Sequence, residues 1–409
     1  MVYVQNIEGK PLMPTTRYGK VRRMLKLKLA IVVQREPFTV RLTYKTLDFT
    51  QPVSLGVDAG SVYVGVSATT RTRELYAAEF QLRRDIVELL ASRREYRRTR
   101  RYRKIRYRKN KFNNRKRKKN WLPPSTENCV NTHIRIIKDT SQILPIHSIT
   151  IEIAPFDTQR LKLSDVSGVQ YQKGEQFGFW NVREYVLFRD NHTCQICKGK
   201  RKDKILNVHH IESRKTGGNS PNNLITLCST CHKLHHQGEL DLKIKRGISM
   251  KNASVMGVMR WEIYNRAKLM YPNVYLTYGY ITKNTRINNG LQKSHIVDAR
   301  CISKNPIAKP CCEYYFFKQT RRHNRQIHKA NILKGNIRKL NQAPFEVKGF
   351  RLFDKVAFNG KTCFIFGRRS SGYFDLRTLK GTRIHASASY KNISLIQRSK
   401  RFLAERINR

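Results

Sequence analysis

Short runs of apolar residues, alternating or continuous, predict strands along much of the chain. We expect strands at residues 2–5, 29–33, 62–68 and 147–159, with a short basic helix between the first two. Helical spacing predicts two further helices, at 127–140 and 291–303. After Pro344, strand-like runs alternate with the turn sequences NGK, GRRSSG and LKG, which predicts a small SH3-like β-barrel. The pattern therefore predicts a mixed α/β protein of several domains.

A dense basic run interrupts this pattern between Arg83 and Asn120, where 19 residues are Lys or Arg and three are acidic. We predict a helix from about Arg84 to Lys111, because this part lacks Pro and Gly and arginine favours helices. Basic residues lie all round such a helix, so it cannot pack along one apolar face and is predicted to bind nucleic-acid phosphates. The arginines assigned to this role are Arg93, Arg94, Arg97, Arg98, Arg101, Arg103, Arg106 and Arg108.

The composition indicates the class of partner. The chain of 409 residues carries 82 Lys and Arg against 28 Asp and Glu, a formal net charge of +54 at pH 7. A compact body with this charge repels itself unless a polyanion neutralises it, which favours nucleic acid over small anionic substrates. Neither a membrane span of roughly 20 apolar residues nor a signal sequence is evident, so we expect an intracellular, cytoplasmic protein.

Four of the nine cysteines form two C-x-x-C pairs with 30 residues between them. Four thiolates at this spacing predict a closed, structural zinc site made by Cys194, Cys197, Cys228 and Cys231. The segment that they bracket contains His209, His210 and Asn223, and His232 follows the last cysteine. A zinc finger that only binds DNA is the alternative, but the order of cysteines and histidines typical of such fingers is absent.

Carboxylates in unusual places indicate a second centre. Asp58 ends an apolar run beside Gly60, where a metal and a phosphate could approach, although a turn aspartate is the simpler interpretation. Glu152 stands alone among isoleucines in a predicted strand, and burying it without a cation would be costly. His295 and Asp298 are three residues apart and share one helix face.

Together these segments resemble one family, the IscB nucleases, which are transposon-associated relatives of the CRISPR single-effector nucleases. The resemblance is carried, in chain order, by GKPLMP at 9–14, GVDAGS at 56–61, the arginine-rich run, ITIEI with FDTQ at 149–159, the block around His209 and His210, HIVDA at 295–299, and RRHNRQIHK at 321–329. It implies an RNase H-like (RuvC) domain split in sequence, an inserted ββα-metal HNH domain and a bridge helix.

The resemblance also implies domain boundaries. These are a PLMP module at 1–50, RuvC-like segments at 51–82, 121–160 and 247–310, the bridge helix at 83–120, the HNH domain with its zinc site at 161–246, a basic RNA-binding segment at 311–344, and a β-rich domain at 345–409 that contacts a motif flanking the target. Arg321, Arg322 and Arg325 are assigned to nucleic-acid binding in the basic segment, and Arg368 and Arg369 are weaker candidates for motif contacts.

Catalytic roles follow from the resemblance, position by position. Asp58, Glu152, His295 and Asp298 match the RuvC-like site, where the three carboxylates are expected to hold Mg²⁺ and hydrolyse one strand by a two-metal reaction. In the HNH block His210 matches the general base, and Asn223 is expected to orient its loop.

His209 and His232 match ligands of one Mg²⁺ in the HNH block. His209 stands where the family has either His or Asp. His235 and His236 have no matching role in the family, and we interpret them as surface residues.

The resemblance implies an RNA-guided endonuclease that cuts both strands of DNA. Its partners would be a guide RNA, called ωRNA, and duplex DNA bearing a short flanking motif, with sequence read by base pairing. Such a protein is expected to act as a monomeric ribonucleoprotein at the nucleoid of a prokaryote or in an organelle of bacterial descent.

Two other functions remain open. One is a protein-only HNH homing or intron endonuclease, for which the HNH block is equally good evidence. The other is a non-catalytic RNA-binding scaffold. Intact Asp58, Glu152, His210 and Asp298 argue against a scaffold, because it has no reason to hold carboxylates near phosphates.

Overall fold

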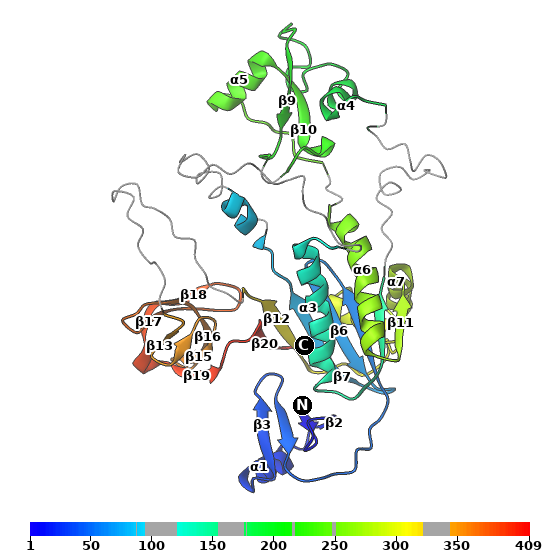
Figure 1. Ribbon diagram of the computed structural model, residues 1–409, viewed down its shortest axis with the longest axis vertical. Helices are drawn as coiled ribbons and strands as arrows, with labels where there is room; N and C mark the ends of the chain where they lie inside the picture. The colour runs from blue at the N-terminus through cyan, green and yellow to red at the C-terminus, as the bar shows by residue number, and fades with distance from the viewer. Residues whose placement is uncertain are drawn as a thin grey trace. The chain divides into compact units, whose positions relative to one another are not determined.

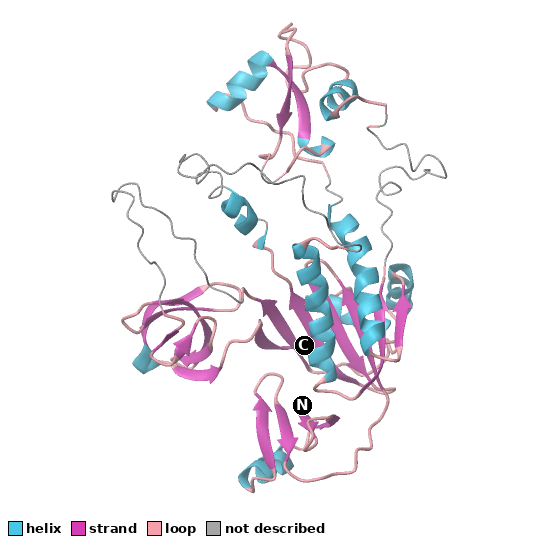
Figure 2. Ribbon diagram, in the orientation of Figure 1, coloured by secondary structure: helices cyan, strands magenta, loops and turns pink. Residues whose placement is uncertain are grey.

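The computed structural model describes residues 1–86, 88–94, 121–153, 176, 178–214, 217–247, 251–321 and 344–409, with only the helical backbone at 251–254. The chain divides into two compact units, each described here by itself. The first comprises Met1–Arg84, Leu122–Ala154 and Met259–Arg409, and the second comprises Asp85–Trp121 and Pro155–Val258. Figure 2 shows that strands and helices are mixed in both units. The predicted mixed α/β class with several sheets is confirmed.

The chain begins with a small sheet covered by one helix. Strands β1 (Val2–Gln5), β2 (Pro11–Thr15), β3 (Ala30–Gln34) and β4 (Thr39–Leu42) form this sheet in the order β2-β1-β4-β3, and α1 (Tyr18–Lys26) joins β2 to β3. Val21 of α1 packs with Val2 and Val40 in a core of its own. The two predicted strands and the helix between them are confirmed, whereas β2 and β4 are strands that the sequence pattern did not reveal.

A seven-stranded sheet is the centre of the first unit (Figure 1). Its strands are β5 (Val53–Ala59), β6 (Tyr63–Thr69), β7 (Glu74–Gln81), β8 (Ile146–Glu152), β11 (Val274–Thr277), β12 (Glu313–Gln319) and β20 (Phe402–Asn408), in the order β11-β8-β5-β6-β7-β12-β20. Segments far apart in sequence thus become neighbours, because β8 lies parallel beside β5 and β11 lies parallel beside β8. Nearly every residue of β5 and β6 is buried, as expected for strands covered on both faces.

Four helices accompany this sheet. They are α3 (Pro124–Ser141), α6 (Lys251–Met270), α7 (Gly279–Asn288) and α8 (His295–Ile302), and α3 and α6 run across one face of it in Figure 1. The helices predicted at 127–140 and 291–303 correspond to α3 and α8. Arg266 of α6 joins the two long helices, because its guanidinium donates to both carboxylate oxygens of Glu127 in α3.

Helix α8 lies unusually close to the sheet. A Cβ atom added to Gly56 of β5 would lie 1.9 Å from the backbone oxygen of Ala299, and one added to Gly65 of β6 would lie 2.0 Å from that of His295. Real Cβ atoms do not approach other atoms so closely, so these two strand positions require glycine. The two glycines therefore let the first turn of α8 lie directly over the end of β5.

A second β structure follows Pro344. The strands β15 (Lys355–Phe358), β16 (Lys361–Arg368), β17 (Tyr373–Arg377), β18 (Arg383–Ser389) and β19 (Ser394–Gln397) form a sheet in the order β18-β17-β16-β15-β19, and β13 (Glu346–Val347) pairs with β14 (Phe350–Arg351). Phe374 and Ile365 are fully buried in its core. The strands and turns predicted here are confirmed, with Asn359 and Gly360 of the NGK turn both at positive φ.

The second unit contains a two-stranded sheet between helices. Strands β9 (Leu206–His210) and β10 (Leu224–Cys228) pair antiparallel, α4 (Val182–Arg189) precedes them and α5 (Ser229–Gln237) follows directly. A single-turn η2 (Pro221–Asn223) leads into β10. The fully buried Leu227 packs with Cys194 and Cys231, so this small domain has its hydrophobic core around the cysteines.

Part of the predicted arginine-rich helix is described. Residues 88–94 are helical, and Arg93 and Arg94 are exposed. The rest of that prediction lies outside the described residues, as do FDTQ at 156–159 and the following arginines: Arg97, Arg98, Arg101, Arg103, Arg106, Arg108, Arg322 and Arg325. In the part of the chain that the structure describes, no helix combines the length and apolar character required to cross a membrane.

The close approach of α8 generates a testable prediction. We expect Gly56→Ala to lower the free energy of unfolding by about 1–3 kcal/mol, because the new methyl group forces α8 away from β5. Gly19→Ala is the matched control, since Gly19 lies in α1 with open space around it and alanine favours helices. Denaturant unfolding of both variants measures the difference, and a Gly56→Ala protein as stable as the control would contradict it.

Candidate functional site

Asp58 and His295 meet in the first unit, although they are 237 positions apart in sequence. Asp58 lies near the end of β5, and His295 is the first residue of α8, after the Ser294 side chain that accepts a hydrogen bond from the Val297 amide. The imidazole Nδ1 is 2.7 Å from Asp58 Oδ2, and the ring stacks on Tyr63 with its centroid 5.5 Å away. The hydrogen bond to Asp58 raises the pKa of His295 despite its partial burial.

Glu152 and Asp298 complete an acidic cluster with Asp58. Glu152 is the last residue of β8, beside β5, and Asp298 lies one turn into α8. Burial raises the pKa of each carboxyl group, and the nearby charge of Asp58 raises both further. Arg286 of α7 forms an ion pair with Asp298 at 2.9 Å. The structure thus brings together all four residues that the sequence predicted for this site.

Three further side chains belong to this cluster and were not predicted. Glu79 of β7 is in register with Gly65, which is in turn in register with Asp58, so the two carboxylates lie on one row across three strands. Burial and then the charge of Asp58 raise the pKa of Glu79, while His295 lowers it. Glu79 gives a signal similar to the one that identified Glu152, an acidic residue flanked by apolar ones within a strand, and could have been found in that way.

The other two are Arg260 and Thr282. Arg260 of α6 is buried, its Nε donates to the backbone oxygen of Ala59 at 3.3 Å, and it is close enough to feel the charges of Glu152 and Asp58. Thr282 of α7 forms a side-chain hydrogen bond with Glu152. No sequence pattern marked these two residues, because their helices reach the cluster only through tertiary packing.

Two groups of side chains in the second unit have geometry suited to holding a metal. Among the described residues, ligand atoms all lie within 4.8 Å of one another in the group of Cys194, Cys197, Cys228 and Cys231 and in the group of His209, His232 and His236. The carboxylates of the acidic cluster do not form such a group in the described chain. Their like charges repel one another, which opposes a closer approach without a cation between them.

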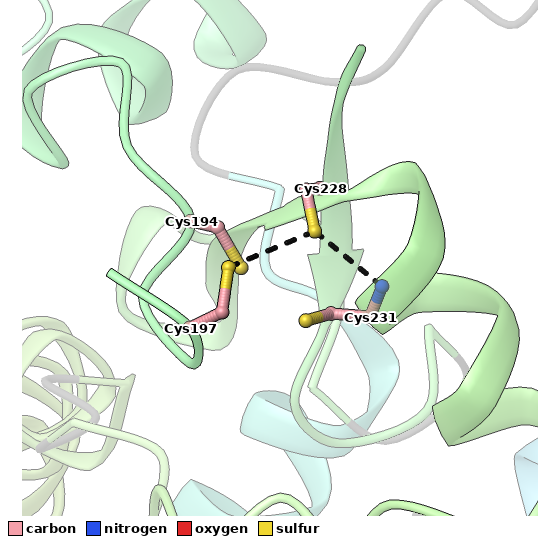
Figure 3. A group of neighbouring side chains, drawn as sticks. All are labelled: Cys194, Cys197, Cys228 and Cys231. Carbon is pink, nitrogen blue, oxygen red and sulfur yellow. Dashed lines mark hydrogen bonds between the residues drawn. The ribbon is translucent and has the colours of Figure 1, made fainter. Parts of the chain in front are cut away.

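The four cysteines come from both ends of the small domain. Figure 3 shows their sulfur atoms pointing toward one another, with Cys228 ending β10 and Cys231 in the first turn of α5. Cys197 Sγ lies 3.9 Å from Cys228 Sγ, and the backbone amide of Cys231 donates to Cys228 Sγ. Burial opposes ionisation of Cys197, but backbone amides of Arg201 and Gly199 and the neighbouring thiols lower its pKa to about 7. This donor set fits a tetrahedral structural zinc ion, as predicted.

The histidine group includes a residue that the sequence analysis had placed on the surface. His209 on β9 and His232 on α5 were predicted ligands, and His236 joins them one helical turn after His232, with its Nε2 3.3 Å from the Nε2 of His232. His236 is exposed, as the surface interpretation expected, but it also belongs to this group, which the sequence analysis did not predict. The signal that could have found it is the spacing of four residues, which places both imidazoles on one helix face. His235 instead contacts the backbone oxygen of Leu240 through Nδ1 at 2.8 Å.

Two imidazoles of this group, those of His209 and His232, have pKa values below the usual range of histidine. Burial, followed by the charges of the other histidines, lowers the pKa of His209 to about 4, and burial lowers that of His232. Neutral imidazoles expose a lone pair, and this is the form that binds metal ions. Three such nitrogens fit a first-row transition ion better than Mg²⁺, which prefers oxygen ligands.

His210 and Asn223 lie at the edge of the same domain. His210 Nε2 is 3.0 Å from Asn219 Oδ1, which accepts a hydrogen bond when the ring carries its proton on Nε2. Asn223 is fully buried, accepts from the Glu212 amide and donates to the backbone oxygens of Glu212 and Gly218. A Cβ at Gly217 would lie 2.1 Å from Asn223 Nδ2. Asn223 therefore holds the loop that follows His210.

Comparison with known proteins gives two family matches. Residues 2–174 match the model of the RRXRR protein family, and residues 194–238 match that of the HNH endonuclease family. The chain carries an HNH endonuclease domain. It is therefore a DNA endonuclease, a phosphodiester hydrolase, and the second match coincides with the cysteine and histidine groups.

Solved structures give only a distant likeness. Streptococcus thermophilus Cas9 in complex with the AGAA PAM is 12% identical, with 51% of this chain and 30% of that chain covered and a TM-score of 0.34. The complex with the GGAA PAM is 13% identical, with 52% and 30% covered and a TM-score of 0.32. The chain thus spans about 30% of the length of these proteins, and TM-scores this low do not establish a shared fold. None of the curated proteins matches the chain.

The cysteine group leads to a prediction about metal and folding. We expect Cys231→Ala to abolish zinc binding and to unfold the small domain, because a structural zinc ion contributes folding energy directly. Zinc content by elemental analysis and unfolding by circular dichroism measure the two effects. Cys312→Ser is the matched control, since Cys312 is exposed and lies outside the group. Equal zinc content in the two variants would contradict the assignment.

The histidine group leads to a second prediction. We expect His236→Ala to weaken binding of Mn²⁺ or Co²⁺ by at least roughly 10–100-fold. Loss of a residue that only supports a metal ligand has this effect, and loss of a ligand itself should cost no less. His235→Ala should change the affinity much less, because its ring contacts Leu240 instead. Isothermal titration of each variant with the metal ion measures the affinity. Equal losses in both variants would show that His236 is not a ligand.

Proposed function

We propose that this chain is an RNA-guided endonuclease of the IscB kind, which cuts both strands of a DNA duplex at two separate centres. The observation that carries the proposal is the meeting of Asp58, Glu152, His295 and Asp298 in a chain that also has an HNH domain. A protein-only HNH nuclease has no use for a second acidic cluster assembled from strands and a helix so far apart in sequence. The boundaries assigned above to the PLMP, RuvC-like, bridge-helix and flanking-motif domains belong to the same proposal.

At the HNH centre His210 acts as the general base. With Nε2 donating to Asn219, the lone pair on Nδ1 is left to take a proton from water as the oxygen attacks phosphorus. The bond between phosphorus and the 3′ oxygen then breaks, and the leaving oxygen takes a proton from solvent water, which gives a 5′ phosphate and a 3′ hydroxyl. Asn223 keeps the loop after His210 in place, and the imidazoles of His209, His232 and His236 would hold a single divalent ion that stabilises charge on the phosphate.

At the RuvC-like centre the carboxylates of Asp58, Glu152 and Asp298 would hold Mg²⁺. Oxygen donors of this kind suit Mg²⁺. Burial raises the pKa values of Glu152 and Asp298, the charge of Asp58 raises both further, and a bound cation would offset these effects. Bound there, the metal would activate water and stabilise the leaving oxygen. His295 is held against Asp58 at the strand end, while Arg260 and Arg286 limit the repulsion among the carboxylates.

The charge of the chain supports an RNA partner. A duplex target and a guide RNA together supply the polyanion that +54 requires, whereas protein-only recognition of a short duplex leaves much of that charge without a partner. The guide would select the target by base pairing, and the protein would read only a flanking motif. We propose that the protein acts at the nucleoid of a prokaryote or in an organelle of bacterial descent.

The two centres lead to a prediction about strands. In RNA-programmed cleavage of a duplex labelled on both strands, we expect His210→Ala to leave only one strand cut and Asp58→Ala to leave only the other. Each substitution removes one centre and leaves the other unit folded. His147→Ala, at an exposed position of β8 away from both centres, serves as the control that cuts both strands. If one substitution abolished both cuts, the assignment of one strand to each centre would be wrong.

The RNA itself gives a further prediction. We expect the purified protein to carry one discrete RNA species and to cut only the DNA that this RNA specifies. Sequencing of the nuclease-protected RNA, followed by cleavage with a reprogrammed guide, tests the expectation. Cleavage of one fixed site by RNA-free protein would instead identify a homing endonuclease.

A further inference from the structure

A cavity of about 1060 Å³ lies within the first unit. Its wall combines residues of the N-terminal module such as Gln34, of the seven-stranded sheet such as Phe80, and of the C-terminal strands such as Phe353. Contacts join these parts around it, with Lys400 Nζ donating to Gln34 Oε1 at 2.9 Å and Lys355 Nζ to Glu36 Oε1 at 2.5 Å. The volume lies at the upper end of the roughly 300–1,000 Å³ of small-molecule pockets, so a nucleotide fits with its flanking phosphates.

The wall of the cavity is cationic. Six basic residues contribute to it: Arg135, Arg321, Arg351, Arg368, Lys400 and Arg401. Only Glu36 and Asp139 are acidic, and both are already paired, Glu36 with Lys355 and Asp139 with Arg135 at 2.7 Å. Arg351 is in turn paired with Glu346 at 2.8 Å, but basic residues still outnumber acidic ones in the wall, so the cavity attracts anions.

Aromatic rings provide the apolar part of the wall. Phe80 and Phe317 stack with centroids 4.5 Å apart, and Phe402 meets Phe80 edge-on at 5.3 Å. At another point of the wall Phe345 is 73% exposed, with the guanidinium of Arg351 5.2 Å from its ring centroid. An exposed ring supported by a cation is a surface on which an unpaired base stacks.

Two residues of the wall flank a basic stretch of the sequence. Arg321 and Phe345, which flank residues 322–343, both line the wall. The sequence between them contains no acidic residue and six basic ones: Arg322, Arg325, Lys329, Lys334, Arg338 and Lys339. The cavity therefore lies where a positively charged segment leaves and rejoins the described structure.

We propose that this cavity binds unpaired nucleotides of the guide RNA, with phosphates at Lys400 and Arg401 and a base on Phe345. The proposal rests on the proposed function, because it takes the bound RNA as the ligand. Paired nucleotides do not fit this role, since a stacked duplex offers no free base face to Phe345. A small anionic metabolite without an aromatic ring would leave the exposed ring of Phe345 unused.

Binding measurements at several salt concentrations test the proposal. Full-length protein freed of co-purified RNA is titrated with a single-stranded RNA and with DNA of the same sequence. Loss of one phosphate contact in Lys400→Met should reduce the slope of log affinity against log salt by about 0.7 for the RNA. Phe345→Ala should weaken RNA binding by about 5- to 150-fold, the effect of losing about 1–3 kcal/mol of base stacking.

Two substitutions in the C-terminal β structure serve as matched controls. Lys361→Met and Tyr373→Ala alter an exposed lysine and an exposed aromatic ring outside the cavity wall, and both should bind like the unchanged protein. If Lys400→Met and Phe345→Ala behaved like these controls, the cavity would not be an RNA site. A loss of affinity for DNA but not for RNA would assign the cavity to a DNA strand and overturn the proposal.

A separate cleavage assay tests the proposed function. RNA-programmed cleavage by the unchanged protein establishes or removes the RNA-guided activity, whichever residues bind the RNA. Active protein whose salt dependence is unaffected by Lys400→Met would therefore reject only the cavity proposal.

Discussion

The first unit is organised around the approach of α8 to two adjacent strands. Gly56 and Gly65 leave no side chain between helix and sheet, so His295 reaches Asp58 at 2.7 Å and Asp298 follows on the next turn of the same helix. Any larger residue at either strand position would move the helix by more than a hydrogen bond tolerates. Backbone packing of α8 against the two strands thus determines where the side chains of the acidic cluster lie.

The same packing creates an electrostatic cost. Asp58, Glu79, Glu152 and Asp298 share one region, and burial raises the pKa of Glu79, Glu152 and Asp298. The fold limits this cost with Arg260, Arg286 and the imidazole of His295 rather than by separating the carboxylates. A site with residual negative charge and few internal counter-charges favours a divalent cation, which is the physical basis of the nuclease chemistry proposed for it.

Local patterns predicted more of the molecule than non-local ones. The C-x-x-C pairs, the strand before Asp58 and the helix beginning at His295 are recognisable within a few residues, and the structure has each of them. Strand β2 was missed because it contains two prolines, which are rare in strands, and β4 was missed because two of its four residues, Thr39 and Arg41, are polar. Glu79 and Arg260 could not be placed in the cluster without the strand register and the helix packing. The gathering of Asp58, Glu152 and Asp298 was expected from family resemblance alone, since their spacing in sequence does not indicate it.

The order of strands in the central sheet has an evolutionary consequence. The whole cysteine-stabilised domain is encoded between β8 and α6, and β8 pairs directly with β11, the first strand after that insertion. Every strand pair of the seven-stranded sheet is therefore made by residues outside the inserted domain. A lineage could gain, lose or exchange this module without redesigning the sheet, so the histidine group and the acidic cluster are free to have separate histories.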